Sequence, residues 1–453
     1  MHETVILGNG VVATGGSEPQ VLTGGAVAWR GERIVAVGPE DGLRRELPGA
    51  GYLDARGGLI LPGFVNLHHH FYSALARGLD PGVGMRTFHE VLDRLWWRLD
   101  RALDADTVRL SAELSAADCI RWGATTVFDH HASPSFLAGS LELIAGAMEA
   151  AGLSAVLCYE VTDRNGRAEA AAGIEENLDF LRAYRDHPRI RGVFGLHASF
   201  TLRDETIAEV AERRGPGAGC HIHVAEDPLD VEASLRSFGR GPVERLDAVG
   251  LLDERALLAH GVHLGPESLD TIAGRDAVLI HHPESNANNG VGRLDPVVAA
   301  AHGCLVGLGT DGMSSAMLRA LRAAFLAHRG GTGDPGSGFA ILPDLLENNV
   351  RVARRFFAEP LLGTLAPQAP ADIVVLDAPP PTPIGPENLF GHLVYGASEA
   401  PVRHTIARGR VLLEDFRHTT LDPEQLAGRA RELSPGLWRR FHALRYGTPF
   451  LGD

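Results

Sequence analysis

Short apolar runs separated by helical patterns dominate the middle of the chain. Each run is nearly continuous in hydrophobic residues, the pattern of a parallel strand that is buried on both faces. Eight such runs alternating with helices predict an α/β protein built on a (β/α)8 TIM barrel. The runs are residues 59–67, 124–128, 155–161, 192–196, 219–224, 256–259, 277–280 and 305–308.

The two ends of the chain show a different pattern. Short alternating runs over 4–7 and 26–29, broken by glycine-rich turns, predict a small antiparallel sheet, and similar material recurs over 371–377 and 404–413. We therefore expect the two ends to form one small discontinuous β-sandwich domain. The predicted domains are 1–57 for its N-terminal part, 58–358 for the barrel, and 359–453 for its C-terminal part with a helical tail.

Titratable side chains follow nearly every apolar run, where the carboxyl ends of barrel strands place an active site. His68 and His70 stand at i and i+2 at the end of the first run, so period two puts both imidazoles on one face of the strand. The alternative is a pair of histidines that only pack near a strand end. Two imidazoles held together beside a Pro-Gly turn favour a metal site over that alternative.

The fifth run, Cys-His-Ile-His-Val-Ala-Glu, carries a second pair of donors and a carboxylate. His221 and His223 share one face, so spacing alone does not decide which of them is a ligand. We favour His223, because Glu226 is close enough to serve the same centre. A straight strand would send Glu226 away from His223, so this interpretation requires the chain to turn at Ala225.

Two further residues complete the predicted site. His260 could equally be a buried core histidine, and Asp311, between Gly309 and Gly312, could be a helix N-cap. A carboxylate at the last strand end, beside several histidines, is better placed as a metal ligand. Three imidazoles and one carboxylate suit zinc, with Fe(II) or Mn(II) also admissible, so we predict one divalent ion per chain.

Composition excludes several classes of function. A formal net charge of −15 argues against nucleic acid as a partner. The sequence contains no lysine, so all 42 basic residues are arginine, which rules out a Schiff-base lysine and a carbamylated lysine between two metals. The four cysteines form no CxxC pair, and we expect buried free thiols. With no apolar run of membrane length and no signal-peptide pattern, we expect a cytoplasmic protein without a membrane partner.

These motifs together resemble the amidohydrolase superfamily, in the branch that contains guanine, 8-oxoguanine and adenosine-type deaminases and triazine chlorohydrolases. The correspondence runs from end to end of the chain. Within the branch, the closest resemblance is to the aminohydrolases associated with selenium metabolism, the SsnA type. The motifs that carry it include Pro62-Gly63 before His68-His69-His70-Phe71-Tyr72, Phe128-Asp129-His130-His131, Gly195-Leu196-His197, His223 with Glu226, Ala259-His260-Gly261, His282-Pro283-Glu284-Ser285-Asn286 and Gly309-Thr310-Asp311-Gly312.

The resemblance implies a metal-dependent aminohydrolase that releases ammonia from an amidine-like C–NH2 carbon of a purine-like or guanidino compound. It assigns His68, His70, His223 and Asp311 to the metal. It gives Glu226 and Asp311 acid/base roles and makes His260 orient the nucleophile. The alternatives are ring opening at a cyclic amide, a chlorohydrolase, and a metal-binding barrel without turnover.

Substrate selection is expected from side chains outside the metal site, because one ligand set serves enzymes of different specificity. The predicted partner is a small nitrogen-rich molecule, and the oligomeric state is open, with a homodimer or a higher homo-oligomer as alternatives. At position 284 this chain has a glutamate where many relatives have a small residue. Glu284 could accept hydrogen bonds from N–H donors of the substrate, and the alternative is a solvated loop carboxylate. The candidate substrate-binding residues are Tyr72, His131, His197, Glu284, Asn286 and Asn289.

Overall fold

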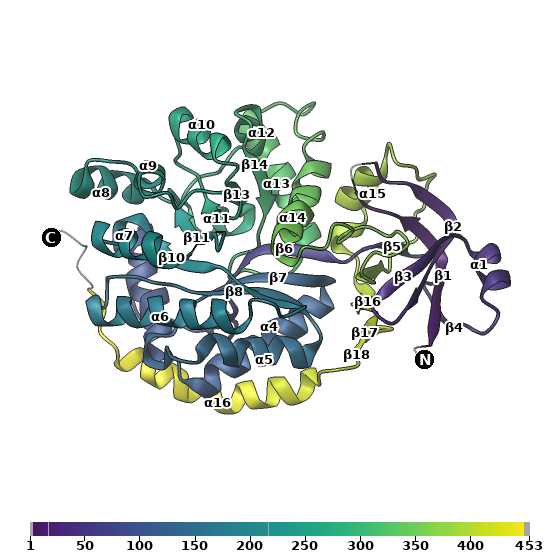
Figure 1. The fold of residues 1–453 in the computed structure, drawn as a ribbon, viewed down its shortest axis with the longest axis horizontal. Helices are drawn as coiled ribbons and strands as arrows, with labels where there is room; N and C mark the ends of the chain where they lie inside the picture. The colour runs from purple at the N-terminus through teal and green to yellow at the C-terminus, as the bar shows by residue number, and fades with distance from the viewer. Residues whose placement is uncertain (1–2, 17, 216, 448–453) are drawn as a thin grey trace.

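The structure is a computed structural model that describes residues 3–16, 18–215 and 217–447. Strands and helices alternate through its middle, and strands from both chain ends lie together at one side (Figure 1). All four cysteines are free and buried, as the sequence predicts. Within the described ranges, no helix combines the length and the apolar character needed to cross a membrane.

Strands from the two ends of the chain form one nine-stranded sheet, in the order β18-β17-β16-β15-β5-β1-β2-β3 with β4 paired to β1. The prediction that both ends contribute to one sheet is confirmed, but the sheet is mixed, because β4 and β5 run parallel to β1. Its strands are β1 (Thr4–Ala13), β2 (Val21–Arg30), β3 (Arg33–Pro39), β4 (Gly51–Asp54), β5 (Leu59–Pro62), β15 (Ile373–Leu376), β16 (Val402–Ala407), β17 (Arg410–Glu414) and β18 (Arg417–His418).

The predicted strand over 59–67 is divided in two. Its first part, β5, pairs with β15 in the nine-stranded sheet, and its second part, β6, pairs with β7. Gly63 makes the junction, because a Cβ at this position would lie 2.3 Å from Thr125 Oγ1. The sequence pattern does not show where the chain passes from one sheet to the other, because both parts are buried and read as one continuous apolar run.

The other strands are parallel and form two sheets, in the orders β6-β7-β8-β9 and β10-β11-β12-β13-β14. Isolated bridges join the two groups, between His69 and Asp311 at one margin and between Val161 and Leu196 at the other. The strands are β6 (Phe64–His69), β7 (Ala124–His131), β8 (Ser154–Tyr159), β9 (Ile190–Gly192), β10 (Phe194–Ala198), β11 (Cys220–Val224), β12 (Leu257–His260), β13 (Val278–His281) and β14 (Leu305–Leu308).

Helices follow most of these strands, and many begin where the sequence supplies a cap. Asp104 and Thr107 form a reciprocal capping box at the start of α4, and Asp422 caps α16, which packs against α4 (Figure 1). The α-helices are α1 (Glu40–Glu46), α2 (Phe88–Val91), α3 (Trp97–Ala102), α4 (Ala105–Arg121), α5 (Ser140–Ala151), α6 (Arg167–Ala183), α7 (Asp204–Arg213), α8 (Pro228–Phe238), α9 (Pro242–Ala248), α10 (Pro266–Gly274), α11 (Pro283–Asn289), α12 (Pro296–Ala301), α13 (Met317–Thr332), α14 (Leu342–Phe357), α15 (Leu389–Tyr395) and α16 (Pro423–Ala443). The other helical segments are the 3-10 helices η1 (Phe71–Ala76), η3 (Pro134–Phe136), η4 (Ser199–Thr201) and η5 (Ala397–Glu399) and the π-helix η2 (Leu92–Trp96).

Candidate active site

Three imidazoles and one carboxylate converge at the carboxyl ends of β6, β11 and β14. His70 Nε2 lies 3.1 Å from His68 Nε2, 3.2 Å from His223 Nε2 and 3.1 Å from Asp311 Oδ1. A tetrahedral zinc ion with ligand bonds of 2.0–2.2 Å holds its ligand atoms about 3.4 Å apart. The spacing of His70 Nε2 from the other three donor atoms is therefore close to what one small divalent cation requires, and His68 Nε2 lies 3.8 Å from Asp311 Oδ1.

Hydrogen bonds on the far side of each imidazole fix its orientation. The Nδ1 groups of His70 and His223 donate to the main-chain carbonyls of His130 at 2.6 Å and His197 at 2.9 Å. His68 Nδ1 lies 2.8 Å from Nε2 of His221. The Nδ1–H groups of His70 and His223 therefore point away from the cluster, and their Nε2 atoms are the ones that face it, as in metal-bound histidines.

Asp311 stands three residues after β14, in a left-handed backbone conformation with φ of +53°. Its Oδ2 accepts a hydrogen bond of 2.5 Å from the hydroxyl of Ser285, and its Oδ1 faces His70. Burial acts to lower the pKa of His70, but the hydrogen bond and charge of Asp311 outweigh it and raise that pKa to about 9. The cluster therefore attracts positive charge at this point.

Glu226 reaches the same centre because the chain turns at Ala225, as the sequence interpretation requires. Ala225 has a φ of +48°, and the backbone N–H of Ala225 donates to Asp230 at 2.7 Å, which holds the turn. Glu226 Oε2 lies 3.4 Å from His260 Nε2, and Asn289 donates to Glu226 Oε1 at 3.2 Å. Burial and the charge of Asp311 raise the pKa of Glu226 well above its ordinary value. The carboxyl is thus suited to hold a proton at neutral pH.

His260 ends β12, with a φ of +74°. Its Nδ1 lies 2.9 Å from Asn286 Oδ1, so a proton on Nδ1 is donated to the amide oxygen and the Nε2 lone pair faces Glu226 and Asp311. Positive φ is strained for a residue with a side chain. Ala225, His260 and Asp311 therefore share this strain at the carboxyl ends of β11, β12 and β14.

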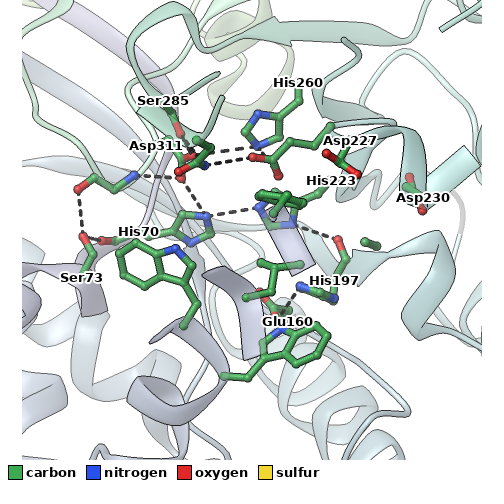
Figure 2. Close-up of a pocket in the computed structure, with 18 of the residues that line it drawn as sticks. His70, Ser73, Glu160, His197, His223, Asp227, Asp230, His260, Ser285 and Asp311 are labelled. Atoms are coloured by element: carbon green, nitrogen blue, oxygen red, sulfur yellow. Dashed lines mark hydrogen bonds and ion pairs between the residues drawn. The ribbon is translucent and has the colours of Figure 1, made fainter. Parts of the chain in front are cut away.

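A cavity of about 960 Å³, counted with its open mouth, lies over this cluster (Figure 2). Of the six predicted substrate-binding residues, Tyr72, His197 and Asn289 line it.

The other three candidates lie behind the described cavity wall. His131 Nε2 is hydrogen-bonded to Ser133, and Asn286 acts on His260. Glu284 faces the charges of Arg319 and Glu399 instead of the cavity. None of the three lines the described cavity, and Asn286 reaches the site through its contact with His260.

Two tryptophans and two carboxylates are among the cavity residues that the sequence interpretation left unassigned. Trp96 and Trp97 come from the long connection between β6 and β7 and form part of an aromatic wall. Asp100, in α3, and Glu160, directly after β8, add two buried carboxylates to the cavity. Only Glu160 had a signal in the sequence, because it follows an apolar run.

Similarity to known proteins agrees with this geometry. Residues 59–412 match the amidohydrolase family. The chain belongs to the amidohydrolase family.

Relatives within the amidohydrolase family are named as deaminases. A 5-methylthioadenosine/S-adenosylhomocysteine deaminase of Pelotomaculum thermopropionicum is 30% identical over 421 residues, covering 91% of this chain and 94% of the relative. A 5'-deoxyadenosine deaminase of Methanosarcina mazei is 27% identical, covering 97% and 99%. The fold is similar to the crystal structure of a zinc-bound adenosine deaminase from Xanthomonas campestris, with a TM-score of 0.84, 21% identity and coverage of 98% and 99%. This amidohydrolase is thus a hydrolase acting on carbon–nitrogen bonds other than peptide bonds.

The two histidines of β11 give a direct test of the ligand set in this amidohydrolase. We expect His223→Ala to lose the metal and all activity, because the Nε2 atom of His223 lies in the cluster. His221→Ala should keep most of the metal, with affinity lowered about 10- to 100-fold, because His221 only orients His68. Metal content by mass spectrometry after dialysis measures both. If His221→Ala lost the metal and His223→Ala retained it, the metal ligand would be His221 and not His223.

Proposed function

We propose that this protein is a deaminase that releases ammonia from an amidine-like C–NH2 carbon of a purine-like or guanidino compound, using one divalent metal ion. The observation that supports it most directly is the convergence of three imidazole Nε2 atoms and Asp311 Oδ1 beside a carboxyl that favours its protonated form. A purely structural metal site has no use for Glu226. The names of the relatives favour adenosine-like substrates.

His68, His70, His223 and Asp311 would hold the metal, and zinc is the ion we propose. Fe(II) and Mn(II) accept the same donors. When bound, such an ion would lower the pKa of water to about 7 and so supply a nucleophile at neutral pH.

The protein's own side chains then move the protons. Glu226, protonated, would donate to the ring or imino nitrogen next to the attacked carbon. Asp311 would accept the water proton and pass it toward the departing amine, while Ser285 keeps its carboxylate oriented. His260, with its Nε2 lone pair toward both carboxyl groups, would orient the nucleophile.

We retain three of the predicted substrate contacts, Tyr72, His197 and Asn289, because all three line the cavity.

For the fold, we infer that the parallel strands close into a (β/α)8 barrel, with β9 and β10 as two parts of one strand. The bridges between the two parallel sheets support this closure. We also propose the domain limits 1–57, 58–358 and 359–453, with the terminal parts forming the small β-sandwich.

A substrate panel tests the proposed function. Zinc-loaded protein should release ammonia from adenosine or 5'-deoxyadenosine and leave the purine chromophore in place. Guanine, 8-oxoguanine and a guanidino compound extend the panel, and ammonia assays coupled to ultraviolet spectra measure both products. Loss of the chromophore would point to ring opening, and chloride release from a chlorotriazine to a chlorohydrolase. No product from any of these compounds would contradict the proposal.

A further inference from the structure

The cavity has a second polar end, on the side of His70 opposite Asp311. In Figure 2, Glu160 lies below His70, whereas Asp311 lies above it. Glu160 and Asp100 both line the cavity, and their exposed fractions are only 4% and 2%. Arg164 pairs with both carboxylates from behind.

The acceptor atoms at this end have few donors of their own. The closest contacts given by the described chain to the Glu160 oxygens are 3.4 Å, to Arg164 Nη2 and to His130 Nδ1, with His197 Nε2 at 3.8 Å. Asp100 Oδ1 has no hydrogen-bond partner among the described residues. A good N–H···O bond is 2.7–3.2 Å long, and buried acceptors without one are costly. Two buried carboxylates therefore leave acceptor capacity beside the cavity.

A second metal ion does not explain this capacity. His130, Glu160 and His223 come close enough to share an ion. However, His223 donates from Nδ1 to the His197 carbonyl and presents Nε2 to the main cluster, so neither of its nitrogens is left for another metal. Only His130 and Glu160 then remain for a second metal. A hydrogen-bond donor on a bound small molecule is the simpler partner for the Glu160 carboxylate.

Charge on the cavity wall points the same way. Its described lining holds six carboxylates and no arginine, and the sequence has no lysine. An anionic group on a substrate would find no arginine or lysine on the described cavity wall, whose basic side chains are histidines, whereas an N–H or O–H donor finds several acceptors. The carboxylates are Asp100, Glu160, Glu226, Asp227, Asp230 and Asp311.

We propose that Glu160, together with Asp100, is the specificity site that accepts hydrogen bonds from the end of the substrate remote from the reacting carbon. The site selects neutral or cationic, donor-bearing substrates against anionic ones. This inference rests on the proposed function, because the reacting carbon is placed at the Glu226 and Asp311 end. The aromatic wall of Trp96 and Trp97 would cover the faces of a flat ring held between the two ends.

Three nucleosides that differ only at the 5' position test the charge preference. Adenosine is neutral, 5'-amino-5'-deoxyadenosine is cationic, and AMP is anionic. On zinc-loaded protein we expect AMP to have a kcat/KM at least about ten-fold below the other two, because close charges in a partly buried site act at low effective dielectric. A wild-type preference for AMP would overturn the inference while leaving deamination intact.

Glu160→Gln then tests the residue itself. We expect the ratio of kcat/KM for the amino nucleoside to that for AMP to fall about ten-fold, mostly through KM, with metal content unchanged. Glu160→Asp keeps the charge and should keep most of the ratio even if Glu160→Gln folds poorly. Glu284→Gln is the matched control, because it removes a partly buried carboxylate outside the cavity. An unchanged ratio in a folded Glu160→Gln variant would overturn the assignment.

Binding separates this inference from the proposed function. If none of the three nucleosides releases ammonia, calorimetric titration of each into the zinc-loaded protein still gives the preference. The specificity site would be supported, even though deamination failed, if the amino nucleoside bound more tightly than AMP and the ratio of their dissociation constants moved closer to one in Glu160→Gln. No binding of any nucleoside at millimolar concentration would overturn the inference as well.

Discussion

His70→Ala should purify without its divalent ion and release no ammonia from any substrate. His70 Nε2 is the donor atom nearest the centre of the cluster, within 3.2 Å of donor atoms of His68, His223 and Asp311. Removing it takes away the imidazole that lies beside all three other donor atoms, so the remaining ligands no longer surround the ion. Metal analysis of wild type should give close to one ion per chain, against near zero in the variant.

His69→Ala is the matched control for that loss. The imidazole of His69 contacts the Ser315 hydroxyl at 3.2 Å and lies outside the donor cluster. The control should therefore retain the ion, even if packing suffers. Two tightly bound ions per wild-type chain, or a metal-replete His70→Ala, would contradict the mononuclear site.

Glu226→Gln should keep its metal and lose about two to four orders of magnitude in kcat, the typical contribution of a general acid or base. Glutamine preserves the contact with Asn289 but has no acidic proton to give. Steady-state ammonia release and metal content, measured on the same preparation, separate the two effects. Loss of the ion from Glu226→Gln would make Glu226 a ligand, and full activity would remove it from the chemistry.

The donor cluster was predictable because each donor follows an apolar run. Period two alone places His68 and His70 on one face, and parallel strands bring their carboxyl ends together. The turn at Ala225 was also predictable, since His223 and Glu226 cannot otherwise face the same point. Its physical form, a non-glycine residue at positive φ, was visible only in the structure.

The cavity wall was less predictable, because it depends on helix phase and on long connections. Ser285, Asn288 and Asn289 of α11 line the cavity, while Glu284 faces Arg319. Asn288 lies only about 40° from Glu284 around the helix, so sequence spacing did not show which of these side chains line the cavity. Trp96 and Trp97 lie in a connection without strand periodicity, so nothing in the pattern placed them over the site.

The pairing of β5 with β15 sets a delay during synthesis. The two strands are separated by about 310 residues, and a ribosome adding about 5–20 residues per second needs about 15–60 s to supply that length. Throughout this interval the first strands carry an open apolar edge, which is where unwanted chain pairing starts. Demand for chaperones should therefore be greatest before the last hundred residues emerge, and mutations in β15 should lower soluble yield more than they lower the activity of the folded enzyme.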